Sequence, residues 1–247
     1  MTAARIAAIA LGLALLPAAA LAQTLNLDLG AAPGGSATAR ILQLVALFTV
    51  ISLAPGILVM VTSFVRISVV LSLLRTALGT QQSPPNIVII SLALFLTGFI
   101  MQPTLEDAYT NGIAPMLEEQ IDEGEALRRT VAPFHRFMMT HVREQDLQLF
   151  LDMARVPADQ QGAETPLQAL IPAFMISELR RAFEIGFLIY LPFVIIDMVV
   201  ASILMSMGMM MIPPVIIAMP FKLIFFVLVD GWYVIAGSLV RSFGAGG

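Results

Sequence analysis

Four apolar runs stand out along the chain, and a polar stretch separates the first two from the last two. The apolar runs cover residues 41–63, 87–101, 183–207 and 215–239, whereas residues 102–181 are polar. Long apolar runs are typical of helices that lie in a membrane or in a buried core. The pattern therefore predicts an all-α, membrane-associated fold in which two long, kinked helical hairpins flank a helical polar insert.

The same pattern divides the chain into segments, and within the insert we expect helices over residues 118–139 and 142–154 because apolar residues recur there at helical spacing. The expected segments are a signal peptide at 1–22, a flexible N-terminal segment at 23–40, the first hydrophobic hairpin at 41–103, the polar insert at 104–181 and the second hydrophobic hairpin, with a methionine-rich turn, at 182–247.

The first 22 residues have the features of a secretory signal peptide. Arg5 precedes an apolar run from Ile6 to Leu16, which is too short to span a bilayer of about 30 Å as a helix. Small residues then end the segment, so we expect cleavage between Ala22 and Gln23 and export of the new N-terminus. A first membrane helix that is retained is the alternative.

Composition excludes several classes of protein. Of the 247 residues, 58% are hydrophobic and 12% are charged, whereas ordinary domains carry about 25% charged residues. The net charge of −4 leaves no basic surplus for nucleic acid, and the chain has no cysteine and only two histidines. We find no phosphate-binding glycine loop, no zinc-binding histidine pair and no nucleophile beside a base. We therefore expect no enzyme, no cofactor and no metal site.

The distribution of charge predicts an orientation. The link between the first two apolar runs carries Arg66 and Arg75 and no acid, whereas residues 102–181 carry 13 acids and seven arginines. Because short positive loops stay in the cytoplasm, we expect the link to face inward and the insert to face the periplasm. An exported N-terminus agrees with this orientation.

Charged residues interrupt the third and fourth runs. Glu184 and Asp197 lie in the third, Lys222 and Asp230 lie in the fourth, and Glu178 comes shortly before the third. A charge at the centre of a bilayer costs roughly 2.5–3.5 kcal/mol on insertion scales. We expect these groups to form ion pairs between helices or between subunits, and Glu178 is another candidate partner for Lys222. The alternative is that they lie near the membrane edges and extend to water.

Prolines and methionines mark the turn between the third and fourth runs. Six methionines fall between residues 198 and 211, and Gly208, Pro213 and Pro214 indicate a turn there, whereas Pro192 and Pro220 should kink or break the helices on either side. The side chains of Met209, Met210 and Met211 cannot all face one helix. Several copies of the turn could form a soft hydrophobic seal, and plastic core filling or contact with lipid is the alternative.

Four stretches resemble the flagellar biosynthetic protein FliP family. They are FVRISVVLSLLRTALGTQQSPP at 64–85, LALFLTGFIMQP at 92–103, the stretch at 171–214 that ends in MGMMMIPP, and PFKLIFFVLVDGW at 220–232. The wording is closer to the flagellar branch than to the related injectisome export-gate subunits of virulence type III secretion, which remain the alternative. A small-solute transporter is a further, less favoured alternative, since broken helices with buried charges also occur in transporters.

The resemblance implies a function that composition alone does not. It implies a non-enzymatic core subunit of the type III export gate in the bacterial inner membrane, at the flagellar basal body. It also implies assembly into a helical ring, a homo-pentamer with two smaller membrane proteins of the same apparatus, that conducts unfolded flagellar proteins. By similarity, Met209, Met210 and Met211 would form a gasket that closes the pore, and Glu178, Asp197 and Lys222 would serve subunit contacts or gate structure.

Overall fold

The computed structural model describes residues 37–80, 82–157, 162, 165–209 and 211–244. The expected signal peptide, its cleavage site at Ala22 and Gln23, most of the segment at 23–40, and Met210 lie outside the described residues. Contacts divide the chain into two units, residues 1–50 and residues 51–247.

The first apolar run forms α2, which extends from Ala37 to Met60 and passes through Pro55 without ending. The structure differs from expectation just after it. The segment from residue 64, expected as a link that faces the cytoplasm, forms the helix α3 (Phe64–Leu78), because it contains no glycine or proline and its apolar residues recur with helical spacing. Helix α3 ends at Gly79, whose φ of 75° is a left-handed cap.

The second apolar run lies in α4 (Asn86–Ala108), which continues through Pro103 into the polar stretch. A π-helical turn, η1 (Tyr109–Ile113), and the short α5 (Ala114–Leu117) follow. The helices expected in the insert are α6 (Glu123–His141) and α7 (Glu144–Ala154). Helix α6 begins at Asp122, whose carboxylate accepts a hydrogen bond of 2.6 Å from the backbone N–H of Glu125, an N-cap that fixes this helix end.

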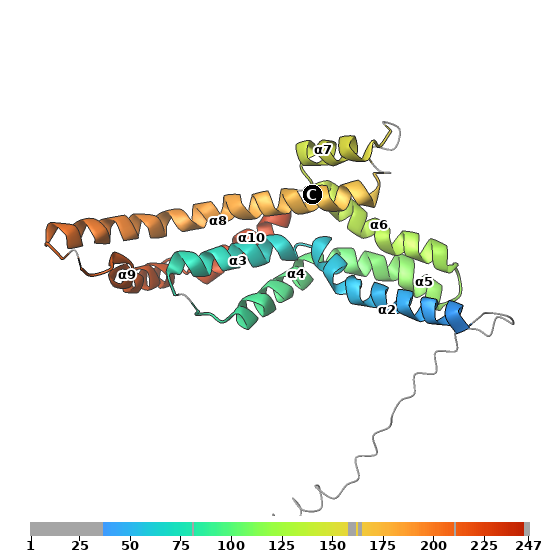
Figure 1. The fold of residues 1–247 in the computed structure, drawn as a ribbon, viewed down its shortest axis with the longest axis horizontal. Coiled ribbons are helices and arrows are strands. Elements are labelled where there is room, and N and C mark those ends of the chain that lie inside the picture. Colours follow the sequence, from blue (N-terminus) through green and yellow to red (C-terminus); the bar gives the residue numbers. More distant parts are fainter. Residues whose placement is uncertain (1–36, 81, 158–161, 163–164, 210, 245–247) are drawn as a thin grey trace, which may run out of the picture. The chain divides into compact units, whose positions relative to one another are not determined.

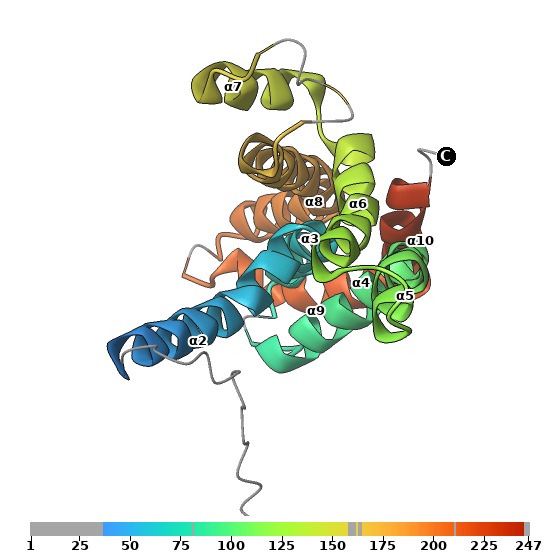
Figure 2. The ribbon, with the colours of Figure 1, turned by 90° about the vertical axis from the view of Figure 1, so that its right-hand side faces the viewer.

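Helix α8 (Leu167–Ser206) is 40 residues long and is continuous across residue 181, where we expected the insert to give way to the second hairpin. Helix α7 packs on α8 (Figures 1 and 2). Ser177 of α8 joins the two helices, because its hydroxyl accepts a hydrogen bond from the backbone N–H of Arg143 at 3.0 Å and donates one to Asp146 at 2.7 Å.

The fourth apolar run forms two helices, α9 (Pro214–Leu228) and α10 (Gly231–Gly244). We expected Pro220 to kink or break the helix, but α9 continues through it. The break comes at Asp230, whose φ is 50°, and the two helices meet at a bend of 63°. Gly231 suits this bend because a Cβ there would lie 2.2 Å from the ring of Phe226.

The main hydrophobic core joins α3, α4, α8, α9 and α10. Its fully buried residues include Ile67, Val70, Leu71, Leu74 and Ala182. Helices α3 and α8 approach closely at Gly186, where a Cβ would lie 2.2 Å from Leu73 Cδ1, and small residues permit such close approach in membrane helices. A second core of Val61, Met138, Leu170 and Phe174 joins α6 to α8.

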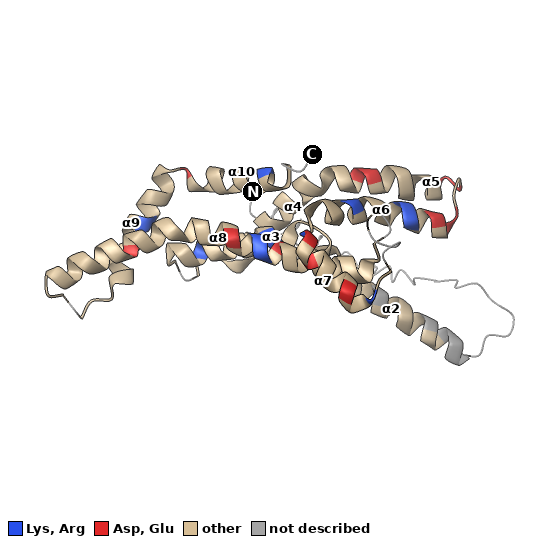
Figure 3. Cartoon of the chain, turned by 90° about the horizontal axis from the view of Figure 1, so that it is seen from above, with Lys and Arg blue, Asp and Glu red and all other residues tan. Residues whose placement is uncertain are grey.

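The prediction of an all-α membrane-type fold is confirmed, because every regular element within the described ranges is helical. Two helical stretches, Asn86–Leu117 and Leu167–Ser206, are long and apolar enough to cross a bilayer. The number rises to four when each of two bent helix pairs is taken as one span. Charged side chains gather on α6 and α7, whereas the end where α8 turns into α9 is almost free of them (Figure 3).

Candidate functional site: the methionine-rich turn and the buried charges

The turn between α8 and α9 begins with a glycine-dependent helix end. Helix α8 ends at Ser206, and Gly208 has a φ of 76°. The backbone N–H of Gly208 donates to the carbonyl of Met205 at 3.1 Å, and that of Met209 donates to the carbonyl of Leu204 at 3.0 Å. This pair of bonds is a Schellman motif, which satisfies two carbonyls at the helix end.

Two prolines begin the next helix. Pro213 is the N-cap of α9 and Pro214 is its first residue. A proline at this position lacks only an N–H that would have no partner within the helix, and its fixed φ suits a helix start. The sequence Gly208 to Pro214 is therefore a turn whose two ends are both set by local backbone chemistry.

Four described methionines at the end of α8 and in the turn are exposed. Met205, Met207, Met209 and Met211 are all exposed, and Met211 is 97% exposed. The transfer of an apolar thioether out of water lowers the free energy. The turn therefore presents an apolar surface that this chain does not cover, which suits a seal built from several copies, although the gasket stays a prediction.

Lys222 and Asp197 lie together near this end of the molecule. Lys222 Nζ lies 2.7 Å from Asp197 Oδ2 and also donates to the backbone carbonyl of Ala77 at 3.0 Å. Lys222 is buried, whereas the Asp197 side chain is 30% exposed. The ammonium group thus joins α9 to α8 and to the last turn of α3, where a carbonyl would otherwise have no helical donor.

Glu178 pairs with a different cation from the one considered for it. Its carboxylate accepts two hydrogen bonds from Arg66 of α3, one of them from Nε at 2.9 Å, and both side chains are fully buried. Arg66 Nη1 also donates to the carbonyl and the hydroxyl of Ser242, at 3.2 Å and 3.0 Å. Helices α3, α8 and α10 therefore meet at one buried ion pair, and Glu178 is not the partner of Lys222.

The burial of Arg66 also corrects the charge argument for orientation. The sequence predicts Arg66 as a loop cation that faces the cytoplasm, but it is a buried member of α3. Of the two arginines used in that argument, Arg75 alone lies toward the turn that joins α3 to α4. A charged residue surrounded by apolar neighbours in the sequence FVRISVV was the signal that a buried partner was required.

The other two charges of the apolar runs lie at the surface. Glu184 accepts a hydrogen bond from Arg180 at 3.0 Å, one helical turn away, and Asp230 is exposed at the bend between α9 and α10. Within the described ranges, no three His, Asp or Glu side chains lie close enough together to hold a metal ion.

The sequence profile of the FliP family matches residues 47–239, which contain all of the charged pairs and the turn described above. The chain belongs to the FliP family. The family resemblance of the four sequence stretches is thereby confirmed.

Relatives from distant bacteria support the same assignment. The flagellar biosynthetic protein FliP of Caulobacter vibrioides is 58% identical over 241 residues, which cover 96% of this chain and 90% of the relative. The FliP protein of Bacillus subtilis is 52% identical over 81% of this chain and 91% of the relative, and that of Aquifex aeolicus is 50% identical over 82% and 85%. The similarity therefore extends beyond the apolar runs into most of the chain.

Proposed function

We propose that this chain is a core, non-enzymatic subunit of the flagellar type III protein export gate in the bacterial inner membrane, at the flagellar basal body. Membership of the FliP family and the long apolar helices support it, and the similar proteins are named as flagellar rather than as injectisome proteins. Several copies, a homo-pentamer together with two smaller membrane proteins of the same apparatus, would form a helical ring that conducts unfolded flagellar proteins.

The observation that carries the proposal is the exposed methionine-rich turn. Met205 and Met207 at the end of α8, and Met209 and Met211 in the turn, are exposed although the chain has a buried core elsewhere. In a ring of copies, the turns would converge on the axis, and Met209, Met210 and Met211 would exclude water and ions from the resting pore. Flexible thioethers would then deform around a passing chain and close again behind it.

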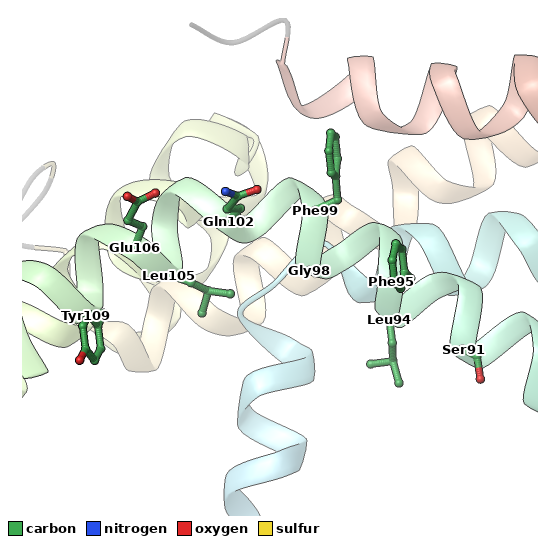
Figure 4. A pocket seen from close by; sticks show the side chains of 9 residues that line it. All are labelled: Ser91, Leu94, Phe95, Gly98, Phe99, Gln102, Leu105, Glu106 and Tyr109. Atoms are coloured by element: carbon green, nitrogen blue, oxygen red, sulfur yellow. The ribbon is translucent and has the colours of Figure 1, made fainter.

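The outer face of α4 supports assembly with other chains. A groove of about 1030 Å³ runs along this face, with Leu94, Phe95 and Phe99 exposed beside the polar Gln102 and Glu106 (Figure 4). An amide and a carboxylate are unfavourable on a face that contacts only lipid, because moving either group from water into hydrocarbon raises the free energy. A protein neighbour can hydrogen-bond these groups and bury the aromatic rings.

The buried charges give the subunit the rigidity that a ring needs. In this proposal the Asp197–Lys222 pair holds the methionine-bearing end of α8 and α9 against α3, and the Glu178–Arg66 pair holds α8 against α3 further along. The polar insert at 104–181 would face the periplasm, in agreement with an exported N-terminus.

Ion leakage through the resting gate tests the function. The variant Met209→Ala/Met210→Ala/Met211→Ala should raise the ion conductance of the purified complex in planar bilayers, because small side chains no longer fill the pore. The matched control replaces Met60, Met116 and Met153, three exposed methionines outside the turn, and should leave the conductance low. Equal conductance of the two triple variants would refute the gasket.

Native mass spectrometry of the complex in mild detergent tests the assembly separately. We expect several copies of this chain together with the two smaller membrane proteins. A particle that contains one copy alone would contradict the ring, whatever the conductance result.

A further inference from the structure

A buried histidine joins the C-terminal turn of α10 to α6. His141 is the last residue of α6, and its Nδ1 lies 2.8 Å from the backbone carbonyl oxygen of Phe137 in the same helix. Its Nε2 lies 3.3 Å from the backbone carbonyl oxygen of Phe243 in α10. The imidazole packs against the rings of both phenylalanines, with centroid distances of 4.5 Å and 5.2 Å.

Both ring nitrogens of His141 thus face oxygen atoms that can only accept a hydrogen bond. A neutral imidazole carries one N–H and can satisfy one of the two carbonyls, whereas an imidazolium carries two and satisfies both. The shorter contact, to Phe137, lies within α6 itself. Loss of one proton therefore removes the hydrogen bond between His141 and the Phe243 carbonyl, whereas the ring contacts of Phe243 with Phe137 and His141 remain.

The turn that His141 holds also completes the buried ion pair. Ser242, the neighbour of Phe243, accepts both hydrogen bonds from Arg66 Nη1, and the guanidinium carbon of Arg66 lies 3.7 Å from the centroid of the Phe243 ring. If this turn of α10 moves away, Arg66 keeps only Glu178 as a hydrogen-bond partner among the described residues. The histidine and the ion pair are therefore coupled through two adjacent residues of α10.

A cavity with several polar side chains in its wall lies beside His141. The cavity has a volume of about 310 Å³ and is lined by His141, Thr104, Thr140, Asp107 and Arg136, among others. Asp107 and Arg136 form an exposed ion pair there, with 3.2 Å between Nη1 and Oδ2. The imidazole itself is 8% exposed, so it is close to water yet largely enclosed.

Charged groups surround His141 on every element packed against it. Helix α8 contributes Glu178 and Arg181, and α10 contributes Arg241. The other charges form pairs: Arg66 of α3 with Glu178, Arg136 of α6 with Asp107 of α4, and Arg143 just beyond α6 with Asp146 of α7.

We propose that His141 is a protonation-dependent latch that holds the C-terminal turn of α10 closed over the Arg66–Glu178 pair. The imidazolium bonds both Phe137 and Phe243 and keeps the turn closed. The neutral imidazole bonds Phe137 alone and lets the turn open. The latch lies within one chain, so it stands or falls independently of the proposed export function.

The distance between α6 and the end of α10 tests the latch. The chain has no cysteine, so spin labels on Ala132→Cys and Gly244→Cys, both exposed positions, report this distance without background. We would measure it by double electron–electron resonance on the full chain in detergent, with labelled chains diluted among unlabelled ones, from about pH 5 to about pH 9, the range in which histidines change charge.

We expect the ratio of long to short distances to rise about tenfold or more with pH, which corresponds to the loss of one charge-assisted hydrogen bond. The variant His141→Gln should make the distribution independent of pH. The matched control is His135→Gln, which changes the only other histidine, one that contacts Thr165 O at 2.8 Å, and should leave the pH response intact.

Two results would overturn the latch: an unchanged distance distribution in the parent chain across the pH range, or a full pH response in His141→Gln. If His141→Gln does not fold, the parent and His135→Gln still decide the matter. A pH response that His135→Gln retains supports His141 as its source, and a response that His135→Gln abolishes refutes it.

Discussion

The buried cluster around Arg66 and the methionine-rich turn differ in how far this chain covers their side chains. Arg66 and Glu178 are fully buried and satisfy each other, with Ser242 and Phe243 as further partners. At the turn, the carbonyls of Leu204 and Met205 are satisfied, but Met205, Met207, Met209 and Met211 are exposed. The comparison indicates that the cluster maintains the subunit, whereas the turn acts on something outside it.

The largest effect on stability should come from the cluster. Arg66→Ala leaves the Glu178 carboxylate buried without its partner, which typically costs about 3–5 kcal/mol. We expect a strong decrease in the Tm of the chain in detergent. Arg75→Ala, in the same helix but at its half-buried last turn, is the control and should change the Tm little; a normal Tm for Arg66→Ala would show that the cluster is not a structural centre.

The ion pair near the turn should matter less. Lys222→Ala removes one partner of Asp197, but the Asp197 side chain is 30% exposed and water can replace part of the interaction. We expect a loss of about 1–3 kcal/mol in the free energy of unfolding. Arg180→Ala breaks the exposed pair with Glu184 and should cost at most about 1 kcal/mol; an equal loss in the two variants would contradict the buried role of Lys222.

Backbone strain at the turn should have a smaller effect still. Gly208 has a φ of 76°, and nothing lies within 4 Å of the position that a Cβ would take. Gly208→Ala should therefore cost about 1–2 kcal/mol through the left-handed conformation alone, without a steric clash. Gly208→Asn should recover part of this loss, because asparagine tolerates that conformation. If Ala and Asn behave alike in thermal unfolding, the Schellman geometry is not maintained in the folded protein.

The smallest effect should come from the exposed ion pairs of α6. Hydrogen bonds from Arg129 and then from Arg128 lower the pKa of the Glu125 carboxyl. A lowered folded-state pKa contributes stability that is present above the unfolded pKa and is lost as the pH falls through the folded value. Glu125→Gln should therefore lower the Tm slightly at neutral pH, and the difference from the parent chain should shrink in acid and vanish once the pH lies below the lowered folded-state pKa of Glu125. A difference that persists below that pH would exclude the carboxylate as its cause.

Much of the fold could be predicted from the sequence because the signals are local. The apolar runs, the helices of the insert and the turn at Gly208 and Pro213 each depend on residues within one or two helical turns. The end of α8 is such a case, because glycine permits the left-handed conformation that a helix end requires.

The partners of the charged residues could not be predicted in the same way. Arg66 and Glu178 are separated by 112 positions, and Arg66 and Ser242 by 176, so only the packing of helices brings them together. The polarity around residue 181 predicts a boundary, yet α8 continues through it. Glu178 bonds Arg66 and Arg181 is half-buried, so neither side chain interrupts the backbone hydrogen bonds of the helix. The family resemblance, which draws on the whole pattern, was the more reliable guide to function.

Disulfide crosslinking between copies tests most directly whether the turns converge. The chain has no cysteine, so Met211→Cys introduces a single thiol at a position where the methionine is 97% exposed. Met153→Cys, at a 69% exposed position in α7, is the matched control. In membranes that contain the assembled apparatus, a mild oxidant should convert the Met211→Cys chain into covalent dimers while the Met153→Cys chain stays monomeric. Monomers in both variants, or dimers to the same extent in both, would contradict a gate closed by the methionine-rich turn.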